Sequence, residues 1–145
     1  MEPNFHNNEY ILTDKISYRF SMPQRGQVVI FKAPNNPDID YIKRIIGLPG
    51  ERVMIRNGNV YINAQILDEP YLVDKTNLFS GSSMKEGIEI TVNEDFYFVM
   101  GDNRPHSSDS REFGPIPKSS IIGKAFMRYW PPQVFGPIRI AEYSI

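Results

Sequence analysis

Three polar residues in the segment from residue 101 to residue 117, GDNRPHSSDSREFGPIP, have a spacing that could serve chemistry. Ser107, Asp109 and Arg111 lie two positions apart. If the segment is extended, their side chains emerge on one face, where Asp109 can pair with Arg111 and the Ser107 hydroxyl stays free to contact another group. A surface loop is the alternative interpretation, because turns select Gly, Asp, Asn, Pro and Ser.

A lysine in an apolar strand is the candidate for that other group. The pattern of residues 38–53, DIDYIKRIIGLPGERV, predicts a strand that ends in a Gly-Leu-Pro-Gly turn. Alternation along the strand puts Lys43 on one face and Arg44 on the other. Both faces are predicted to be buried, since they also hold Ile39, Tyr41 and Ile45 on the first and Ile42 and Ile46 on the second. Either the two stems lie along apolar surface with their charged ends in water or on carboxylates, or Lys43 is buried in a neutral form.

A neutral Lys43 would have a catalytic use. Burial penalises the charged amine, so its pKa falls from about 10.4 and the amine can act as a general base near neutral pH. A fall of roughly 2 to 3 units costs about 3 to 4 kcal/mol, which only function would justify. A hydroxyl such as that of Ser107 can hydrogen-bond to the neutral amine without restoring its charge, as a carboxylate would. We therefore predict that the polar segment orients a neutral Lys43.

The elements that position these residues are predicted to be short strands. Runs rich in Val, Ile, Tyr and Phe recur between clusters of Gly, Pro and Asn, and no long segment keeps a helical period. Asn57-Gly58, between two such runs, is a strong signal for a two-residue hairpin. We predict a mainly β, antiparallel, barrel-like domain, closed or nearly so, with short helices only around residues 3–8 and 117–120. The predicted strands are EYILTDKI, QVVIFKA, DIDYIKRII, ERVMIRN, NVYIN, IEITV, DFYFVMG and IIGKAFMRYW.

Length and composition narrow the functional classes. The 145 residues suit a single domain, 1–145, in which residues 68–93 form a small excursion and residues 131–145 a peripheral tail. The net charge of -1 and the lack of a basic run argue against nucleic acid as a partner. The chain has no Cys and only two His, so thiol catalysis is excluded and neither a metal nor another cofactor is expected. No window has the roughly 18 apolar residues of a membrane span, so the chain is expected to be soluble.

Three motifs, in this order, carry a resemblance to a known family. RGQVVIF, YIKRIIGLPGE and GDNRPHSSDSREFGPIP are similar to the arginine-glycine strand, the lysine segment and the acidic-serine segment of the type I signal peptidases. The resemblance runs from residue 1 to about residue 130. It implies a membrane-anchored serine endopeptidase that removes signal peptides from exported preproteins with a Ser/Lys dyad. It also implies a bacterial-type cell membrane, with the catalytic domain on its extracytoplasmic side.

The resemblance assigns roles to residues of these motifs. By similarity, Lys43 is the general base and Ser107 is its hydrogen-bond partner. Asp109 and Arg111 would form the ion pair that supports them. Structural support of the site is expected from three residues that begin the acidic-serine segment, Asp102, Asn103 and Arg104.

The nucleophile of this family lies in a segment Ser-Met-x-Pro, and the chain opens MEPNF, which matches from the second position onward. The serine is therefore expected directly before Met1, with the family's membrane helix a few residues further upstream. Without that serine, the chain as written is expected to be inactive. Ser21 is the alternative nucleophile, but no spacer separates Ser21-Met22 from Pro23, and Ser21 lies only 22 residues before Lys43, about half the family's interval.

The resemblance also suggests where the substrate and the membrane would lie. A signal peptide would bind as an extended strand beside Asp40, Tyr41 and Ile42. Met1 and Phe5, together with Tyr41 and Ile42, would leave room only for Ala, Gly or Ser before the cut, unless these four are core residues. Four aromatic residues are candidates either for a membrane-facing surface or for the core: Phe126, Tyr129, Trp130 and Phe135.

Two other functions stay open. A self-cleaving repressor-type protease shares the Ser/Lys chemistry, but the GDNR segment and the lack of an Ala-Gly or Cys-Gly cleavage site ahead of the domain count against it. A non-catalytic peptide-binding β-domain would use Lys43 and the polar row only as structure. The two classes differ in the charge of Lys43, which a binding module would keep in mildly alkaline solution.

Overall fold

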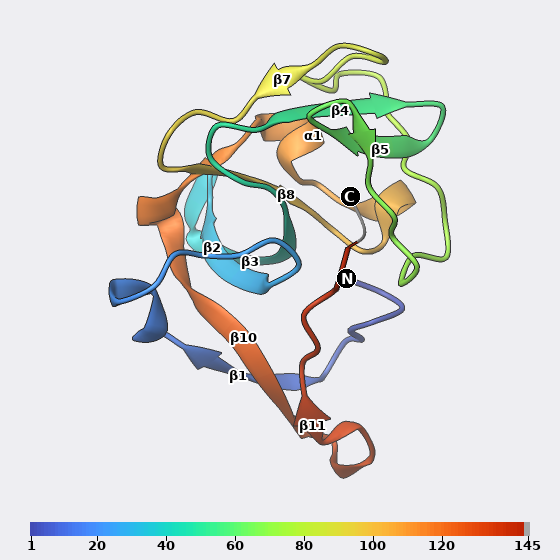
Figure 1. The fold of residues 1–145 in the computed structure, drawn as a ribbon. Helices are drawn as coiled ribbons and strands as arrows, with labels where there is room; N and C mark the ends of the chain where they lie inside the picture. Colours follow the sequence, from blue (N-terminus) through green and yellow to red (C-terminus); the bar gives the residue numbers. More distant parts are fainter. Residues whose placement is uncertain (144–145) are drawn as a thin grey trace.

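The computed structural model of the chain describes residues 1–143, which form two antiparallel β-sheets (Figure 1). The larger sheet has the strand order β1-β10-β2-β3-β8-β9, with β11 beside β10. Its strands are β1 (Tyr10–Asp14), β2 (Val28–Ala33), β3 (Asn36–Gly47), β8 (Phe96–Met100), β9 (Ile116–Pro117), β10 (Ile121–Trp130) and β11 (Gly136–Pro137). The smaller sheet has the order β6-β5-β4-β7 and consists of β4 (Arg52–Arg56), β5 (Asn59–Ile62), β6 (Gln65–Ile66) and β7 (Ile90–Thr91).

The helical part of the described chain is small. It comprises α1 (Ser110–Phe113) and the 3₁₀ turns Ser17–Arg19, Arg104–His106, Lys118–Ser120 and Pro132–Val134. The mainly β, antiparallel class is therefore confirmed, and every predicted strand run contains a strand. Within residues 1–143 neither sheet closes into a barrel. No helix of the described chain is long and apolar enough to cross a membrane.

The expectation that short helices occur at most around residues 3–8 and 117–120 is wrong, because α1 and three of the 3₁₀ turns lie outside both ranges. The helix expected at residues 117–120 is present as the 3₁₀ turn Lys118–Ser120, but residues 3–8 form no helix. There, Phe5 N donates to Met1 O at 3.1 Å and closes a single turn, and Asn8 then adopts a φ of 67°. Because Phe5 is buried in a core cluster, tertiary packing fixes the path of this segment against its local helical signal.

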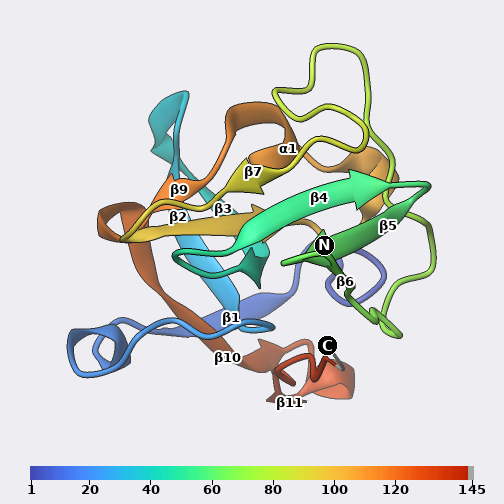
Figure 2. The same ribbon diagram turned by 45° about the horizontal axis from the view of Figure 1, so that its top comes forward.

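The hairpin predicted at Asn57-Gly58 is confirmed. Both residues have positive φ, 51° and 76°, as a type I′ turn requires. The turn joins β4 to β5, with Ile55 opposite Val60. Side chains from both strands pack under the smaller sheet against β8, and Figure 2 shows this sheet lying across the larger one. The resulting core cluster consists of Ile46, Val53, Ile55, Val60, Ile62, Leu67, Met84, Val92, Phe98 and Met100.

β3 connects the remaining two core clusters. Ile45 and Tyr41 pack with Val29 and Phe31 in one cluster, whereas Ile42 packs with Phe5 in the other. The predicted alternation along this strand is therefore confirmed. The prediction that both faces are buried is wrong for residues 36–40, which are exposed, because the β2–β3 hairpin extends beyond the neighbouring strands.

One edge of β3 is open over most of its length. β2 pairs with it from Val28, opposite Arg44, to Ala33, opposite Asn36. β8 pairs on the other edge only from Arg44 to Gly47. Among the described strands, none pairs with that edge of residues 36–43, so part of its backbone N–H and C=O groups are available to an extended peptide.

The two less regular segments both pack against these sheets. Residues 68–89 contain no strand or helix, yet Met84 is fully buried in the core under the smaller sheet. After β10 the chain turns at Pro132–Val134, adds β11, and brings Tyr143 into edge-to-face contact with Tyr71, 5.9 Å between ring centres. Residues 144 and 145 of the predicted tail lie outside the described part.

Candidate active site

Lys43 lies on β3 directly before the point where β8 begins to pair. Its Nζ is 5.2 Å from the centre of the Tyr41 ring. Burial lowers the pKa of Lys43 below its ordinary value of 10.5, and the Arg111 guanidinium acts in the same direction, against the carboxylates of Asp109 and Asp102. None of the ion pairs between described residues includes Lys43. Such an amine loses its proton at a lower pH than an exposed one.

Ser107 lies beside this lysine, on the other side of a glycine. A Cβ built on Gly101 would collide with Ser107 Oγ and would lie 3.7 Å from Lys43 Cδ. The glycine therefore leaves the space in which the lysine stem and the hydroxyl come together. Ser107 is 8% exposed, and its Oγ forms no hydrogen bond of regular geometry within residues 1–143, although it lies close enough to the Asp109 carboxylate to help lower the pKa of that group. A buried hydroxyl without a partner carries a free-energy cost, so it is available to hydrogen-bond to an incoming group.

Replacing Gly101 with alanine is expected to destabilise the chain by about 1–3 kcal/mol, because the new methyl group must push Ser107 aside or move β8. Urea denaturation measures this loss as a lower free energy of unfolding. The double variant Gly101→Ala/Ser107→Gly removes the colliding side chain and is expected to regain part of the loss. If the glycine at 107 brings no recovery over Gly101→Ala alone, the collision is not the cause.

Asp109 and Arg111 form the predicted ion pair, although the backbone differs from the prediction. Asp109 Oδ1 accepts from Arg111 Nε at 2.9 Å and Oδ2 from Nη2 at 2.8 Å, and both side chains are 0% exposed. The chain is extended only as far as Asp109, which caps α1 by accepting from Arg111 N at 3.2 Å. The expected extended row through Arg111 is thus wrong, because the carboxylate starts a helical turn that brings the guanidinium back to it.

This pair ties the polar segment to its surroundings. Asp109 Oδ2 also accepts from Gly101 N at 3.0 Å, which holds the glycine beside Ser107. Arg111 donates to Asn77 O at 2.7 Å, and its guanidinium lies 5.4 Å from the centre of the Phe79 ring. Burial opposes ionisation of Asp109, but the hydrogen bonds and charge of Arg111 outweigh it and lower the pKa of the carboxyl. The pair is therefore charged at neutral pH.

Asp102 forms a second buried pair, with Arg44 on the face of β3 opposite to Lys43. Arg44 Nε and Nη2 donate to its two oxygens at 2.9 and 2.7 Å, and Nη1 donates to Gly26 O at 2.8 Å. Asp102 also accepts from Asn4 Nδ2 at 2.9 Å. No local pattern connects Arg44 with Asp102, which lies 58 residues away; a cation on a buried face indicates only that some carboxylate must meet it.

Arg104 and Asn103 also lie in the polar segment. Arg104 is fully buried and donates to Glu69 at 2.9 and 2.5 Å, to the Thr76 hydroxyl and to Gly101 O. Glu69 was not among the predicted residues. Asn103 precedes the 3₁₀ turn, and its carbonyl accepts from His106 N at 3.1 Å.

The five predicted substrate-binding residues are divided between the faces of β3. Met1, Phe5 and Ile42 pack together, whereas Tyr41 packs on the opposite face, and the exposed Asp40 pairs with Lys32 at 2.7 Å. Met1 also reaches the site: burial lowers the pKa of its α-amine, and the charge of Lys43 lowers it further. Its Sδ accepts from Asp102 N at 3.4 Å. The Met1 α-amine is therefore within reach of the Lys43 charge.

Ser21, the alternative nucleophile, forms a hydrogen bond within its own turn. Its side chain is exposed, and its Oγ donates to Ser17 O at 2.9 Å in the turn that follows β1.

The sequence of this chain matches a known protein family. Residues 1–130 match the sequence model of the family described as "Signal peptidase, peptidase S26". The chain belongs to this family.

Relatives within the signal peptidase family support the same assignment. A probable signal peptidase I-2 of Synechocystis sp. is 42% identical over 137 residues, which is 90% of this chain and 59% of that protein. Signal peptidase IB of Staphylococcus aureus is 34% identical over 142 residues, 90% of this chain and 73% of the relative. The crystal structure of a signal peptidase I from Enterococcus faecalis has a TM-score of 0.59 and 36% identity, and covers 72% of this chain and 97% of its own. The chain thus spans 59% of the first of these relatives' length.

Four aromatic residues were predicted to lie either in the core or on the surface, and all four lie at the surface of this signal peptidase domain. Phe126 is 39%, Tyr129 43%, Trp130 52% and Phe135 66% exposed. The core alternative is wrong for these residues, because they lie on or beyond the part of β10 that pairs only with the edge strands β1 and β11. The Tyr129 ring packs on that of Tyr10, 5.7 Å between centres.

Proposed function

We propose that this chain is the catalytic domain of a serine endopeptidase that removes signal peptides with a Ser/Lys dyad, with Lys43 as the general base. The observation that carries the proposal is the setting of Lys43. Its amine is partly buried, has a lowered pKa and forms no ion pair with a described residue, and its stem lies across Gly101 from the buried hydroxyl of Ser107. A lysine whose role is only structural would be expected to keep its charge on a carboxylate or in water.

The chemistry follows from the neutral amine. A serine hydroxyl is a poor nucleophile at its own pKa, so Lys43 would take its proton as the oxygen attacks the scissile carbonyl. Ser107 would hold the amine in the direction of that hydroxyl, and Asp109 with Arg111 would hold Gly101 and Ser107 in place. Lys43 then returns the proton to the leaving amine of the mature protein.

The nucleophile would be a serine directly before Met1. The effect of the Lys43 charge on the pKa of the Met1 α-amine supports this position, because a residue joined to that nitrogen would begin within reach of the same charge. The serine's own backbone N–H would be one donor to the oxyanion, and a hydroxyl upstream of it the other. Loss of one such donor typically costs about 10²- to 10³-fold in rate.

The preprotein would bind as an extra strand along the open edge of β3. Residues 40–42 lie on the part of that edge that no described strand covers. The backbone hydrogen bonds of an added strand are independent of sequence, so selection of small residues before the cut would come from the side chains of Met1, Phe5 and Ile42 on one face and Tyr41 on the other. The exposed aromatic residues of β10 would face the membrane surface.

The test is to place a serine directly before Met1 and to assay cleavage of a peptide that contains an Ala-x-Ala signal-peptide cleavage site. We expect the serine-extended chain to cleave after the second Ala, and the same chain with alanine at the added position to be inactive. Ser21→Ala in the extended chain is the matched control and is expected to keep full activity, because Ser21 contacts only its own turn. A serine-extended chain that binds the peptide without cleaving it would instead favour a peptide-binding module.

A further inference from the structure

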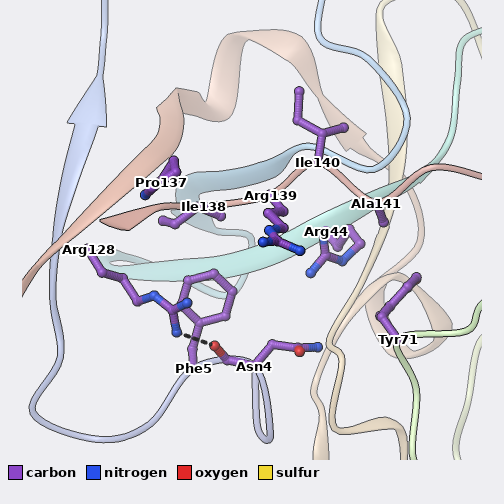
Figure 3. Close-up of a pocket in the computed structure, with 10 residues that line it drawn as sticks. All are labelled: Asn4, Phe5, Arg44, Tyr71, Arg128, Pro137, Ile138, Arg139, Ile140 and Ala141. Carbon is purple, nitrogen blue, oxygen red and sulfur yellow. Dashed lines mark hydrogen bonds between the residues drawn. The ribbon is translucent and has the colours of Figure 1, made fainter. Parts of the chain in front are cut away.

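A cavity of about 260 Å³ lies on the side of β3 from which Arg44 projects (Figure 3). The N-terminal segment, β3, β10 and the chain after β11 all contribute to its walls. Phe5 belongs both to this cavity and to the proposed substrate-binding residues, so the cavity adjoins that site, but it lies on the Arg44 face of β3 and not on the Lys43 face. Its lining residues are Asn4, Phe5, Arg44, Tyr71, Arg128, Pro137, Ile138, Arg139, Ile140 and Ala141.

Three arginines point into this one cavity, and two of them have unused donors. Arg44 is satisfied by Asp102 and Gly26 O. Arg128 donates from Nη1 to Asn4 O at 2.9 Å, but its buried Nε has no partner within residues 1–143. Arg139 is exposed and forms no hydrogen bond or ion pair between side chains with any other described residue.

Among residues 1–143, the carboxylates that contact these arginines do not balance their charge. Two carboxylates face the three guanidinium groups, Asp102 on Arg44 and Glu9, whose Oε2 lies 3.7 Å from Arg128 Nη1. One positive charge and several N–H donors are left over. Asn4 also fixes the cavity walls. Its backbone carbonyl accepts from Arg128, and its side-chain amide donates to Asp102 at 2.9 Å. A preformed site with surplus donors favours an anion with several acceptor oxygens.

We propose that this arginine pocket binds a phosphate group. The planar guanidinium presents its N–H groups in a fork that matches phosphate oxygens, and Arg128 and Arg139 can share one phosphate between them. The cavity volume leaves room for the group together with ordered water, since one water occupies about 30 Å³ of liquid volume. A phosphate bound here would accept from the N–H groups of Arg128 Nη2 and of Arg139, which form no hydrogen bond with a described residue.

The phosphate could be free in solution or part of a phospholipid headgroup, and the surroundings favour the headgroup. Tyr129 and Trp130 directly follow Arg128 on β10, and Phe135 directly precedes β11, whose Pro137 lines the cavity. All three are exposed aromatic residues, which suit the boundary between lipid headgroups and acyl chains. Basic pockets at such a boundary bind lipid headgroups.

The experiment compares Arg139→Gln with Arg56→Gln, a matched control in which an exposed arginine of β4, away from the cavity, is neutralised. Two reagents distinguish the sources at one fixed salt concentration: inorganic phosphate, followed by calorimetry, and vesicles of phosphatidylcholine with or without phosphatidylglycerol, followed by sedimentation. We expect binding to the phosphatidylglycerol vesicles to weaken about fivefold in Arg139→Gln relative to Arg56→Gln.

Each outcome decides the proposal. A selective loss with vesicles only identifies the headgroup, and a selective loss with inorganic phosphate as well identifies a site for phosphate in general. Equal effects of the two substitutions would mean attraction to surface charge and would overturn the pocket, as would failure of both reagents to bind. Arg128→Gln provides a second variant, and thermal unfolding of each protein shows whether it is folded.

Discussion

Lys43→Met in the serine-extended chain is expected to lower kcat/KM for signal-peptide cleavage on the order of 10²- to 10⁴-fold, the range for removal of a general base. Methionine keeps the apolar stem of the side chain but cannot take a proton. Since the amine forms no ion pair between described residues, the variant should fold as well as its parent. Steady-state cleavage kinetics measure the effect, and Lys85→Met, which removes an exposed lysine, is the control that should change nothing.

The pH dependence of the parent gives an independent check on the same residue. A base works only when deprotonated, so the rate should rise with pH through the pKa of Lys43. Burial and the Arg111 charge lower that pKa, so the midpoint is expected below the ordinary value of 10.5. A midpoint at or above that value would contradict the assignment of Lys43 as the base, even if Lys43→Met is inactive.

The strands and the ion pair Asp109–Arg111 could be predicted from the sequence because both depend on local patterns. Alternation along residues 41–46 was enough to place Lys43 and Arg44 on opposite faces, since strand geometry repeats every second residue. The pair forms for a different local reason from the one expected. An aspartate at the start of a helix can accept from the backbone and from an arginine two residues on, so the same spacing serves a helical turn.

The carboxylate partners of Arg44 and Arg104 could not be predicted. Asp102 and Glu69 lie 58 and 35 residues away from them, and no local pattern encodes such a distance. For the same reason the turn at Met1–Phe5 was missed, because Phe5 is held by residues of β2 and β10. The role of Gly101 also depends on tertiary structure, since only the folded chain places Ser107 against it.

The different surroundings of the two faces of β3 explain why Arg44 forms an ion pair whereas the pKa of Lys43 is lowered. On the Arg44 face, Asp102 meets the guanidinium with two hydrogen bonds and the charge is kept. On the Lys43 face, the carboxylate of Asp109 already accepts hydrogen bonds from Arg111 and from Gly101 N, so it forms no ion pair with the lysine. The Asp109–Arg111 pair thus has two effects on the site: it positions Ser107, and it withholds a carboxylate from the base.

Asp109→Asn is expected to lower the free energy of unfolding by about 3–5 kcal/mol, because it leaves the guanidinium of Arg111 buried without its counter-charge. Both side chains are 0% exposed, so water does not compensate. Chemical denaturation at pH 7 measures the loss. Asp40→Asn is the matched control: its partner Lys32 is about half exposed, and removal of that pair should cost less than about 1 kcal/mol.

The acid limb of the stability curve provides the stricter test of the same pair. The pKa of Asp109 is lowered in the folded chain, so its contribution is complete above the unfolded value near 3.9 and is lost as the pH falls through the folded value below that. Asp109→Asn removes the titrating group, so the difference in stability between parent and variant should shrink as the pH falls from about 5 toward about 2. A difference that stays constant over this range would mean that the carboxylate's charge contributes nothing, and that the loss at pH 7 comes from changed packing alone.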